Sequence, residues 1–477
     1  MNSLIKNWHY ILGILLGIGM GFITVFLGWW SPALSVALVI TVFIFFLSVK
    51  KPFTGLILIT FLLPFERIGS FDVAGSTIRG SQIIALAVLA SFVFYFLLEK
   101  RKRLAANPLA SWMLLFLGIS LLSLITAVNF QRGLMVWFFI AFVFAISWLI
   151  PNLINNKKQL KIIIGALLLT TVIVSIFGLY QFLGDVAGLP SSITGLREHY
   201  TSEVFGFPRI HSTGLEPLYF ANFLLIPIGI ILSLWLARLK AKTWWLKSFI
   251  LLLLLGLAGL NLILTLSRGG YLGLFITVFV IAIILWQKLL HPQVIVLSVG
   301  LILVALLAAT YFIQLGEQDA LSTFTEQATT FTTGSGVVER FDTYEQAWDL
   351  FQTKPWLGVG IGNFGPEVAT YPDEIPNTGW LIVNNQYLET LAETGIFGLF
   401  TFLMIPLILL IRSAKAILKA QDKFIKLVLI GLTAAALGTF FQYLTFSTIY
   451  ILHIWFLIGL LIACQNLVLI KPHEENN

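Results

Sequence analysis

Long apolar runs alternate with short polar segments along most of the chain, a pattern typical of a protein that crosses a membrane many times. Fourteen runs approach the length of ~20 residues that an α-helix needs to span a bilayer core of ~30 Å. They occupy residues 10–28, 33–49, 52–65, 81–98, 108–127, 133–150, 161–184, 216–236, 245–266, 270–287, 293–314, 396–411, 425–444 and 448–468. The third run is short and contains Pro64, which predicts a broken or tilted helix. The predicted fold class is an all-α polytopic membrane protein with about 12–14 transmembrane helices.

Basic residues decide which ends of the spans face the cytoplasm. Clusters of Lys and Arg recur in alternate loops, and such clusters mark the cytoplasmic side. On this topology 21 of the 29 Lys and Arg residues lie inside, and 18 of the 22 Asp and Glu residues lie outside. Ile11 to Gly28 is predicted to be the first span rather than a cleaved signal peptide. We therefore expect a multi-pass protein of the plasma (inner) membrane with both termini inside.

Three outer loops, at residues 66–80, 185–215 and 315–395, are long. Apolar residues from Val338 to Phe351 recur at helical spacing, so the last loop is expected to hold an amphipathic helix. The expected regions are an N-terminal transmembrane bundle (1–184), an outer loop with the spans that carry Arg209 and Arg268 (185–314), a large extracytoplasmic loop (315–395) and C-terminal transmembrane helices (396–477).

Composition agrees with a membrane protein and excludes several functions. The chain is 58% hydrophobic and only 11% charged, whereas soluble proteins have roughly 25% charged residues. Its net charge of +7 follows from the cytoplasmic loops, so no nucleic-acid partner is expected. The single cysteine, Cys464, excludes an intrachain disulfide. Gly360, Gly362 and Gly365 form a GxGxxG pattern, but no strand precedes it, which favours a tight turn over a nucleotide cofactor site.

Arginine dominates the few basic residues predicted to lie outside, although lysine dominates inside. The eight outer residues are Arg67, Arg79, Arg132, Arg197, Arg209, Arg268, Arg340 and Lys354. A guanidinium group binds phosphate or carboxylate through two parallel hydrogen bonds. The outer arginines are therefore candidates for an anion site, and pairing with outer acids is the alternative.

Residues 197–223 place several polar groups just before a span. Arg197, Arg209, His211 and Glu216 lie here, and Pro217 occupies a favoured first position of the following helix. The positive end of a helix beside an arginine suits an anion. The alternative is a polar loop with a helix cap.

Arg268 and Arg340 follow later in the chain. Arg268 lies between two apolar runs with almost no loop, and a charge at the membrane boundary is usually functional or paired. Snorkelling towards water is the alternative for this residue. Arg340 lies near the start of the predicted amphipathic helix, where Glu339 or Asp342 are alternative partners.

The stretch from Asn384 to Gly395 leads into the twelfth span. Asn385, Glu389 and Glu393 fall on one face of a helix, because they are spaced four residues apart. This face is expected to line an outer cavity, with Glu389 as a candidate general base. The alternative is a solvated start of the helix.

Four motifs follow in a fixed order: PRIHSTGLEP, LTLSRGG, ERFDTYEQAWDLFQTKPWLGVGIGNF and NNQYLETLAETGIFGLF. In this order they resemble the O-antigen ligase and O-antigen polymerase superfamily of membrane glycosyltransferases with a C-type fold. The resemblance implies polysaccharide biosynthesis at the cell envelope. It also implies a polyprenyl-diphosphate-linked (undecaprenyl) glycan donor, a glycan or lipid-glycan acceptor and contact with membrane lipids, with no metal and no cofactor.

The resemblance also implies site residues. The family arginines that hold the lipid diphosphate correspond to Arg209, Arg268 and Arg340. The expected catalytic residues are Arg209, Arg268, Arg340, Glu389 and His211, and the expected substrate-binding residues are Arg197, Glu216, Asn384, Asn385 and Tyr387. The family usually has histidine where this chain has Asn384, and His211, His199 and His453 are possible substitutes for it.

A second class of function is a membrane transporter or flippase for a lipid-linked oligosaccharide or a small anion such as bicarbonate, and a third is a non-catalytic scaffold. A transporter places polar groups along a path through the middle of the membrane. Here they cluster at the outer rim, and Gln442 and His453 lie near the outer ends of their spans. The sequence favours transfer, and it leaves open whether the protein is a polymerase or a ligase.

Overall fold

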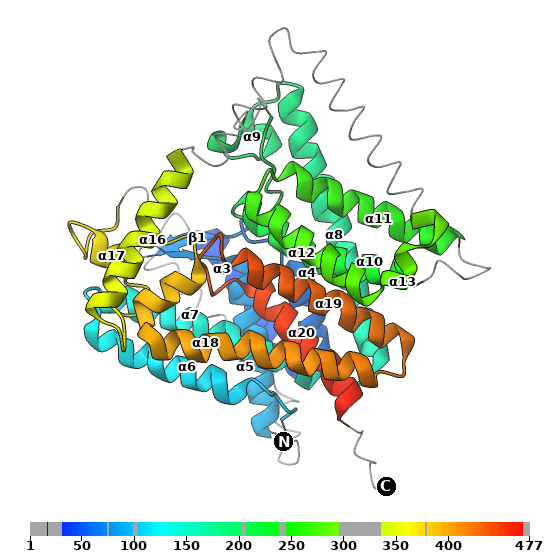
Figure 1. Cartoon of the computed structure of the whole chain (residues 1–477), viewed down its shortest axis with the longest axis horizontal. Helices are drawn as coiled ribbons and strands as arrows, with labels where there is room; N and C mark the ends of the chain where they lie inside the picture. The colour runs from blue at the N-terminus through cyan, green and yellow to red at the C-terminus, as the bar shows by residue number, and fades with distance from the viewer. Residues whose placement is uncertain are drawn as a thin grey trace.

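The structure, a computed structural model, is built almost entirely of helices packed side by side (Figure 1). It describes residues 31–73, 76–98, 104–201, 207–237, 245–294, 335–376 and 379–470, together with residue 17. Within these described ranges, seven helices are long and apolar enough to cross a membrane: α5 (Gly80–Leu98), α7 (Phe130–Leu153), α8 (Lys157–Val186), α10 (Pro217–Leu236), α18 (Gln386–Lys419), α19 (Lys423–Gln442) and α20 (Leu452–Leu469). The chain is therefore a multi-pass membrane protein, as the sequence predicts.

Five further apolar helices fall at other predicted spans. They are α3 (Ser31–Lys50), α4 (Pro52–Leu62), α6 (Ala110–Ser123) with the 3-10 turn η2 (Leu124–Thr126), α11 (Trp245–Leu264) and α12 (Arg268–Ile284). The break predicted near Pro64 is present, because α4 ends at Leu62. The predicted spans 10–28 and 293–314 lie almost wholly outside the described residues.

The remaining described elements are short or lie outside the apolar bundle. They are a hairpin of β1 (Phe71–Val73) and β2 (Ser76–Ile78), followed by α9 (Ser191–Thr194), η3 (Glu198–Tyr200), α13 (Trp286–Leu289), α16 (Ser335–Thr353) and α17 (Phe364–Val368). The two strands are antiparallel, with Phe71 opposite Ile78, and no other sheet occurs among the described residues. Three-residue strands are too short to show an alternating pattern, so the sequence did not predict this hairpin.

Helices α10, α19 and α20 form the centre of the bundle. Their apolar windows are 83%, 78% and 78% buried, and α7, α8, α11, α12 and α18 pack around them. Gly229 of α10 faces Gly431 of α19 so closely that a Cβ at Gly229 would lie 2.5 Å from the Gly431 carbonyl oxygen. Small residues at a crossing let two membrane helices pack backbone to backbone.

Contacts between loops divide the bundle into two ends. At one end the predicted outer loops meet: Glu66 N–H donates to Thr213 O over 3.1 Å, and Arg132 Nε donates to Gly362 O over 2.8 Å. At the other end the predicted inner loops meet, where Lys157 forms an ion pair with Asp422. The grouping agrees with the alternation of loops predicted from the positive charges.

The predicted amphipathic helix is α16, which packs against α18 and ends before Pro355. Its protein-facing side includes Thr343 and Ala347, which are buried, whereas Phe341 and Trp348 are 65% and 49% exposed. The predicted apolar face is therefore only partly buried in the protein. Large aromatic side chains exposed in this way are common at the interface between membrane and water.

Candidate functional site

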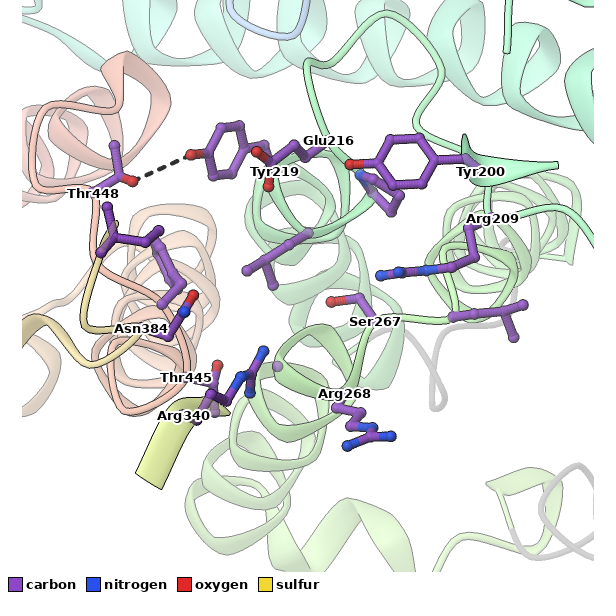
Figure 2. A pocket seen from close by; sticks show the side chains of 16 residues that line it. Tyr200, Arg209, Glu216, Tyr219, Ser267, Arg268, Arg340, Asn384, Thr445 and Thr448 are labelled. Carbon is purple, nitrogen blue, oxygen red and sulfur yellow. Dashed lines mark hydrogen bonds between the residues drawn. The ribbon is translucent and has the colours of Figure 1, made fainter. Parts of the chain in front are cut away.

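A cavity of about 400 Å³ opens among the outer ends of the central helices (Figure 2). Its walls come from segments far apart in the sequence: the loop before α10, the turn between α11 and α12, helix α16, the loop before α18 and the loop between α19 and α20. The polar residues that line it are Tyr200, Arg209, Glu216, Tyr219, Ser267, Arg268, Arg340, Asn384, Thr445 and Thr448. We call this cavity the arginine pocket.

Arg209, Arg268 and Arg340, each from a different segment, all line the arginine pocket. They are close enough for the charge of Arg268 to be repelled by those of Arg340 and Arg209. Three cations gathered at one cavity repel each other unless an anion joins them, so the pocket is suited to a polyanion.

The backbone around the pocket holds Arg209 and Arg268 in place. Arg209 Nε donates to Thr265 O over 3.3 Å, and its guanidinium lies 5.7 Å from the centre of the Tyr200 ring. Arg268 is the first residue of α12, and the side chain of Ser267 caps that helix by accepting the Gly270 N–H. The turn that ends at this cap brings both arginines to the same rim.

Helix α16 brings Arg340 to the pocket, and the hydroxyl groups of Thr343 and Tyr344 fix the helix there. Thr343 Oγ1 donates to Val383 O over 3.1 Å. The single hydroxyl hydrogen of Tyr344 is shared between Leu444 O at 3.3 Å and Asn384 O at 3.5 Å. These contacts tie the outer helix to the loops before α18 and after α19, which also line the pocket.

Unusual backbone conformations cluster at this site. Ser212, Leu266 and Asn384 are the non-glycine residues with positive φ among those described, at 51°, 47° and 58°. Two of the three, Leu266 and Asn384, line the pocket. Such conformations are uncommon outside glycine and concentrate at functional sites. Asn384 is held in its conformation by a hydrogen bond of 2.8 Å from its N–H to Ser447 Oγ.

Glu216 lies on a different side of the pocket from Arg340 and Arg268 (Figure 2). It is the residue before α10, with Pro217 at the first helical position, as the sequence predicts. Burial raises the pKa of Glu216, while the nearby charge of Arg197 opposes the shift. Beside it, the Tyr219 hydroxyl forms a hydrogen bond of 3.2 Å with Thr448 Oγ1.

A buried polar network lies behind this wall. Arg79 Nη1 and Glu66 Oε1 form an ion pair of 3.1 Å, with side chains only 6% and 3% exposed. The Arg79 guanidinium also lies 5.7 Å from the centre of the Tyr219 ring. His453 continues the network, with Nδ1 3.6 Å from Glu66 Oε1 and Nε2 3.1 Å from Asn222 Oδ1.

Of this network the sequence connected only His453 with the site, as a possible substitute for the family histidine, and it did not assign several pocket residues. The sequence did mark Arg79 as a candidate, because it is one of the arginines predicted to lie outside. Glu66 lies in the same long outer loop, but nothing in the sequence pairs the two. Nothing in the sequence distinguishes four further pocket residues from their neighbours, because only the packing of the helices brings them to the pocket. They are Tyr219, Ser267, Thr445 and Thr448.

His211, expected to be catalytic, does not line the pocket. It is fully buried, its Nδ1 donates to Gly214 O over 3.0 Å, and its ring lies 5.8 Å from that of Tyr200. Burial lowers its pKa to about 4, with smaller contributions from the charges of Arg67 and Arg197. It is therefore a neutral imidazole behind the wall.

Glu389 does not line the arginine pocket either. Its Oε2 accepts a hydrogen bond from the Val383 N–H over 2.8 Å. Asn385 caps α18 by accepting from Tyr387 and Leu388, and the Tyr387 hydroxyl donates to Phe440 O over 2.7 Å. Both side chains thus support the helix that ends at the pocket.

The other residues raised by the sequence lie around the pocket without lining it. Arg197 precedes the turn η3 and interacts with Glu216 by charge. His199 is exposed, with its ring 4.0 Å from that of Tyr200. Glu393 is buried and accepts the Phe364 N–H over 3.0 Å.

The glycine pattern is a structural turn. Gly360 and Gly362 both have positive φ, at 103° and 71°, and Gly360 N–H donates to Glu393 O. A Cβ at Gly360 would lie 2.7 Å from that of Ala127. The turn therefore packs the large outer loop against the bundle. Among the described residues, no cluster of three or more His, Cys, Asp or Glu side chains suits a metal ion.

Comparison with known proteins identifies the region that contains two of the three arginines. Residues 251–403 match the family model Wzy_C, O-antigen ligase, so this membrane protein contains an O-antigen ligase domain. The matched region includes Arg268, Arg340 and Asn384, whereas Arg209 and Glu216 precede it. No curated protein matches the chain.

Proposed function

We propose that this membrane protein, whose O-antigen ligase domain indicates a glycosyltransferase, moves a glycan from a polyprenyl-diphosphate donor to an acceptor hydroxyl. The reaction takes place at the outer face of the plasma membrane. The observation that carries the proposal is the meeting of Arg209, Arg268 and Arg340 at one pocket beside the outer ends of the spans.

Electrostatics explains why such a pocket suits this reaction. A glycosyl diphosphate ester carries two negative charges, and a further charge develops on the leaving oxygen as the sugar departs. Guanidinium groups fixed in advance stabilise that developing charge without reorganisation during the reaction. Each group of this kind contributes about 10²–10³ in rate in enzymes where one has been removed. Three arginines therefore provide both binding and leaving-group stabilisation.

The position of the pocket suits a lipid substrate. Arg268 begins α12, whose following turns expose Phe275 and Phe279 to 63% and 51%. Exposed aromatic side chains on a membrane helix face lipid. A donor whose diphosphate is held by Arg268 can therefore keep its polyprenyl chain in the bilayer alongside this helix.

The distribution of buried polar groups supports transfer over transport. Asn222 is the sixth residue of α10, Gln442 is the last of α19, and His453 is the second of α20. With a rise of ~1.5 Å per residue, Asn222 lies about 8 Å into its helix. This polar network remains near the outer ends of the helices, whereas a transporter needs a polar path through the membrane.

Alanine variants of the pocket arginines provide the test. We expect Arg209→Ala, Arg268→Ala and Arg340→Ala each to lower the amount of surface glycan by about 100-fold or more, while the protein still inserts in the membrane. Arg268→Lys should retain part of the activity, because lysine keeps the positive charge but cannot form the two parallel hydrogen bonds of a guanidinium group. Glycan is measured by gel electrophoresis of cell-envelope extracts, and insertion by membrane fractionation.

The matched control is Lys354→Ala. Lys354 is also a predicted outer cation, but its partners are Glu367 at 3.3 Å and Thr126 O at 3.4 Å, away from the pocket. This variant should keep its surface glycan. If all three arginine variants make glycan of normal length and amount, the proposed function is wrong.

A further inference from the structure

Among the described residues that line the arginine pocket, Glu216 is the only carboxylate. We propose that Glu216 is the general base that takes the proton from the acceptor hydroxyl. The inference rests on the proposed function, and it assigns to Glu216, which was expected from the sequence to bind substrate, the role of general base that the sequence had suggested for Glu389.

The position of Glu216 leaves its carboxylate available. Its backbone oxygen accepts the Phe220 N–H at the start of α10, and Pro217 restricts the backbone that follows. Among the residues that the structure describes, its side chain has neither an ion pair nor a hydrogen bond. A carboxylate that lines a cavity without a protein partner can accept a hydrogen bond from a substrate.

Two of the three arginines whose charges act on Glu216, Arg79 and Arg209, have other partners. Arg79, which interacts with Glu216 by charge, forms its ion pair with Glu66. Arg209 also interacts with Glu216, but its Nε donates to Thr265 O. The charge of Arg197 acts on Glu216 more strongly than the other two, but in the described part of the chain no ion pair joins these two side chains. Glu216 is therefore not held in a salt bridge there.

The surroundings of Glu216 also favour a base at neutral pH. Burial raises the pKa of Glu216, and the charge of Glu66 raises it further, while Arg197, Arg79 and Arg209 oppose the rise. A carboxylate with a raised pKa is a stronger base than an ordinary one.

The other candidates are less suitable. Glu389 accepts the Val383 N–H and does not line the pocket. His211 is fully buried behind Tyr200 and donates its Nδ1–H to Gly214 O. Asn384 lines the pocket, but a side-chain amide does not take up a proton.

The pocket separates the two parts of the reaction. Figure 2 shows Glu216 beside Tyr219 and Tyr200, away from Arg340 and Arg268. The acceptor oxygen attacks the anomeric carbon and forms the new C–O bond, while the bond from that carbon to the diphosphate oxygen breaks. The hydroxyl proton moves to the Glu216 carboxylate, and the bond electrons leave with the diphosphate, whose charge the arginines stabilise.

The variant Glu216→Gln tests this assignment, because it keeps the shape of the side chain and removes the proton acceptor. We expect the full-length protein in nanodiscs to bind undecaprenyl diphosphate as tightly as the wild type or several-fold tighter, since a negative charge has left the pocket. Glycan transfer should fall by about 10²–10⁴-fold. Transfer is measured in membranes from cells that make the lipid-linked glycan.

A pH profile distinguishes a base from a structural residue. The wild-type rate should rise with pH through one ionisation, and Glu216→Gln should lose this acid limb. Glu216→Asp should keep it at a lower rate. The matched control is Glu367→Gln, since Glu367 is an outer carboxylate that pairs with Lys354 outside the pocket. Glu367→Gln should keep the wild-type transfer rate and the wild-type pH profile.

Two results would overturn the assignment: transfer by Glu216→Gln within threefold of the wild type, or equal losses of binding and transfer in this variant. The proposed function fails in a different way. In that case the wild-type protein does not bind undecaprenyl diphosphate, or Arg268→Ala binds it as tightly as the wild type.

Discussion

His211 illustrates how burial decides what a residue near the pocket can do. Its imidazole is fully buried and donates from Nδ1 to Gly214 O, and its pKa is lowered to about 4. In the unfolded chain a histidine binds a proton below about pH 6.5. Between these two pH values the unfolded state therefore binds more protons than the folded state, so folding stability falls as pH falls.

We expect His211→Asn to reduce this pH dependence. Asparagine can donate to Gly214 O in place of Nδ1–H, but it does not titrate. The wild-type protein should lose up to about 3 kcal/mol of stability between pH 6.5 and 4 through this group, and the variant should lose less. Thermal unfolding in detergent at a series of pH values measures the difference. The control is His199→Asn, at an exposed position, whose stability should depend on pH as that of the wild type does. If the stability of His211→Asn falls with pH as steeply as that of the wild type, the account is wrong.

At the scale of single residues, the sequence singled out three arginines that line the pocket, whereas the two other residues that it expected to be catalytic, Glu389 and His211, do not line it. Arg209, Arg268 and Arg340 stood out because charge near an outer membrane boundary is costly. The spacing of Glu389 and Glu393 correctly placed both on one helical face. That face bonds to the backbone of Val383 and Phe364 instead of lining the pocket. Which groups a face meets depends on long-range packing, which helical spacing does not contain.

At the scale of elements, a kink in α18 links the large outer loop to the bundle. Gly395 interrupts the helix with φ 65° and ψ −169°, and the next N–H, of Ile396, donates to Pro355 O over 2.9 Å. A Cβ at Gly395 would lie 2.3 Å from the carbonyl carbon and oxygen of Trp356. The predicted twelfth span began at residue 396, so its start coincides with this kink. The segment from Gln386 to Thr394 can therefore run in a different direction and end beside the pocket.

Gly395→Ala should destabilise the protein by about 1–3 kcal/mol or more, because only glycine adopts this conformation without strain and the new methyl group meets backbone. It should also lower glycan transfer, since the outer loop that carries Arg340 is anchored here. Gly118→Ala is the matched control: Gly118 lies inside α6, and a Cβ there has no neighbour within 4 Å. Its melting temperature should be unchanged or higher. Equal melting temperatures for Gly395→Ala and the wild type would show that the kink does not need glycine.

At the scale of the whole molecule, apolar runs and positive charges predicted the described spans and their alternation. The sequence could not show that Arg209, Arg268 and Arg340 share a pocket. Their meeting depends on how α10, α12 and α19 pack and on how α16 is anchored over their ends. Those contacts join segments more than a hundred residues apart, such as Gly229 and Gly431. No local pattern specifies them.

The binding of undecaprenyl diphosphate to the purified full-length protein tests the central claim most directly, with undecaprenol as the uncharged comparison. The account predicts that the wild type binds the diphosphate at least tenfold more tightly than undecaprenol. It also predicts that Arg209→Ala, Arg268→Ala and Arg340→Ala each lose about tenfold or more of this preference, whereas Lys354→Ala retains it. Equal affinity for both lipids, or a preference that survives all three arginine substitutions, would contradict it.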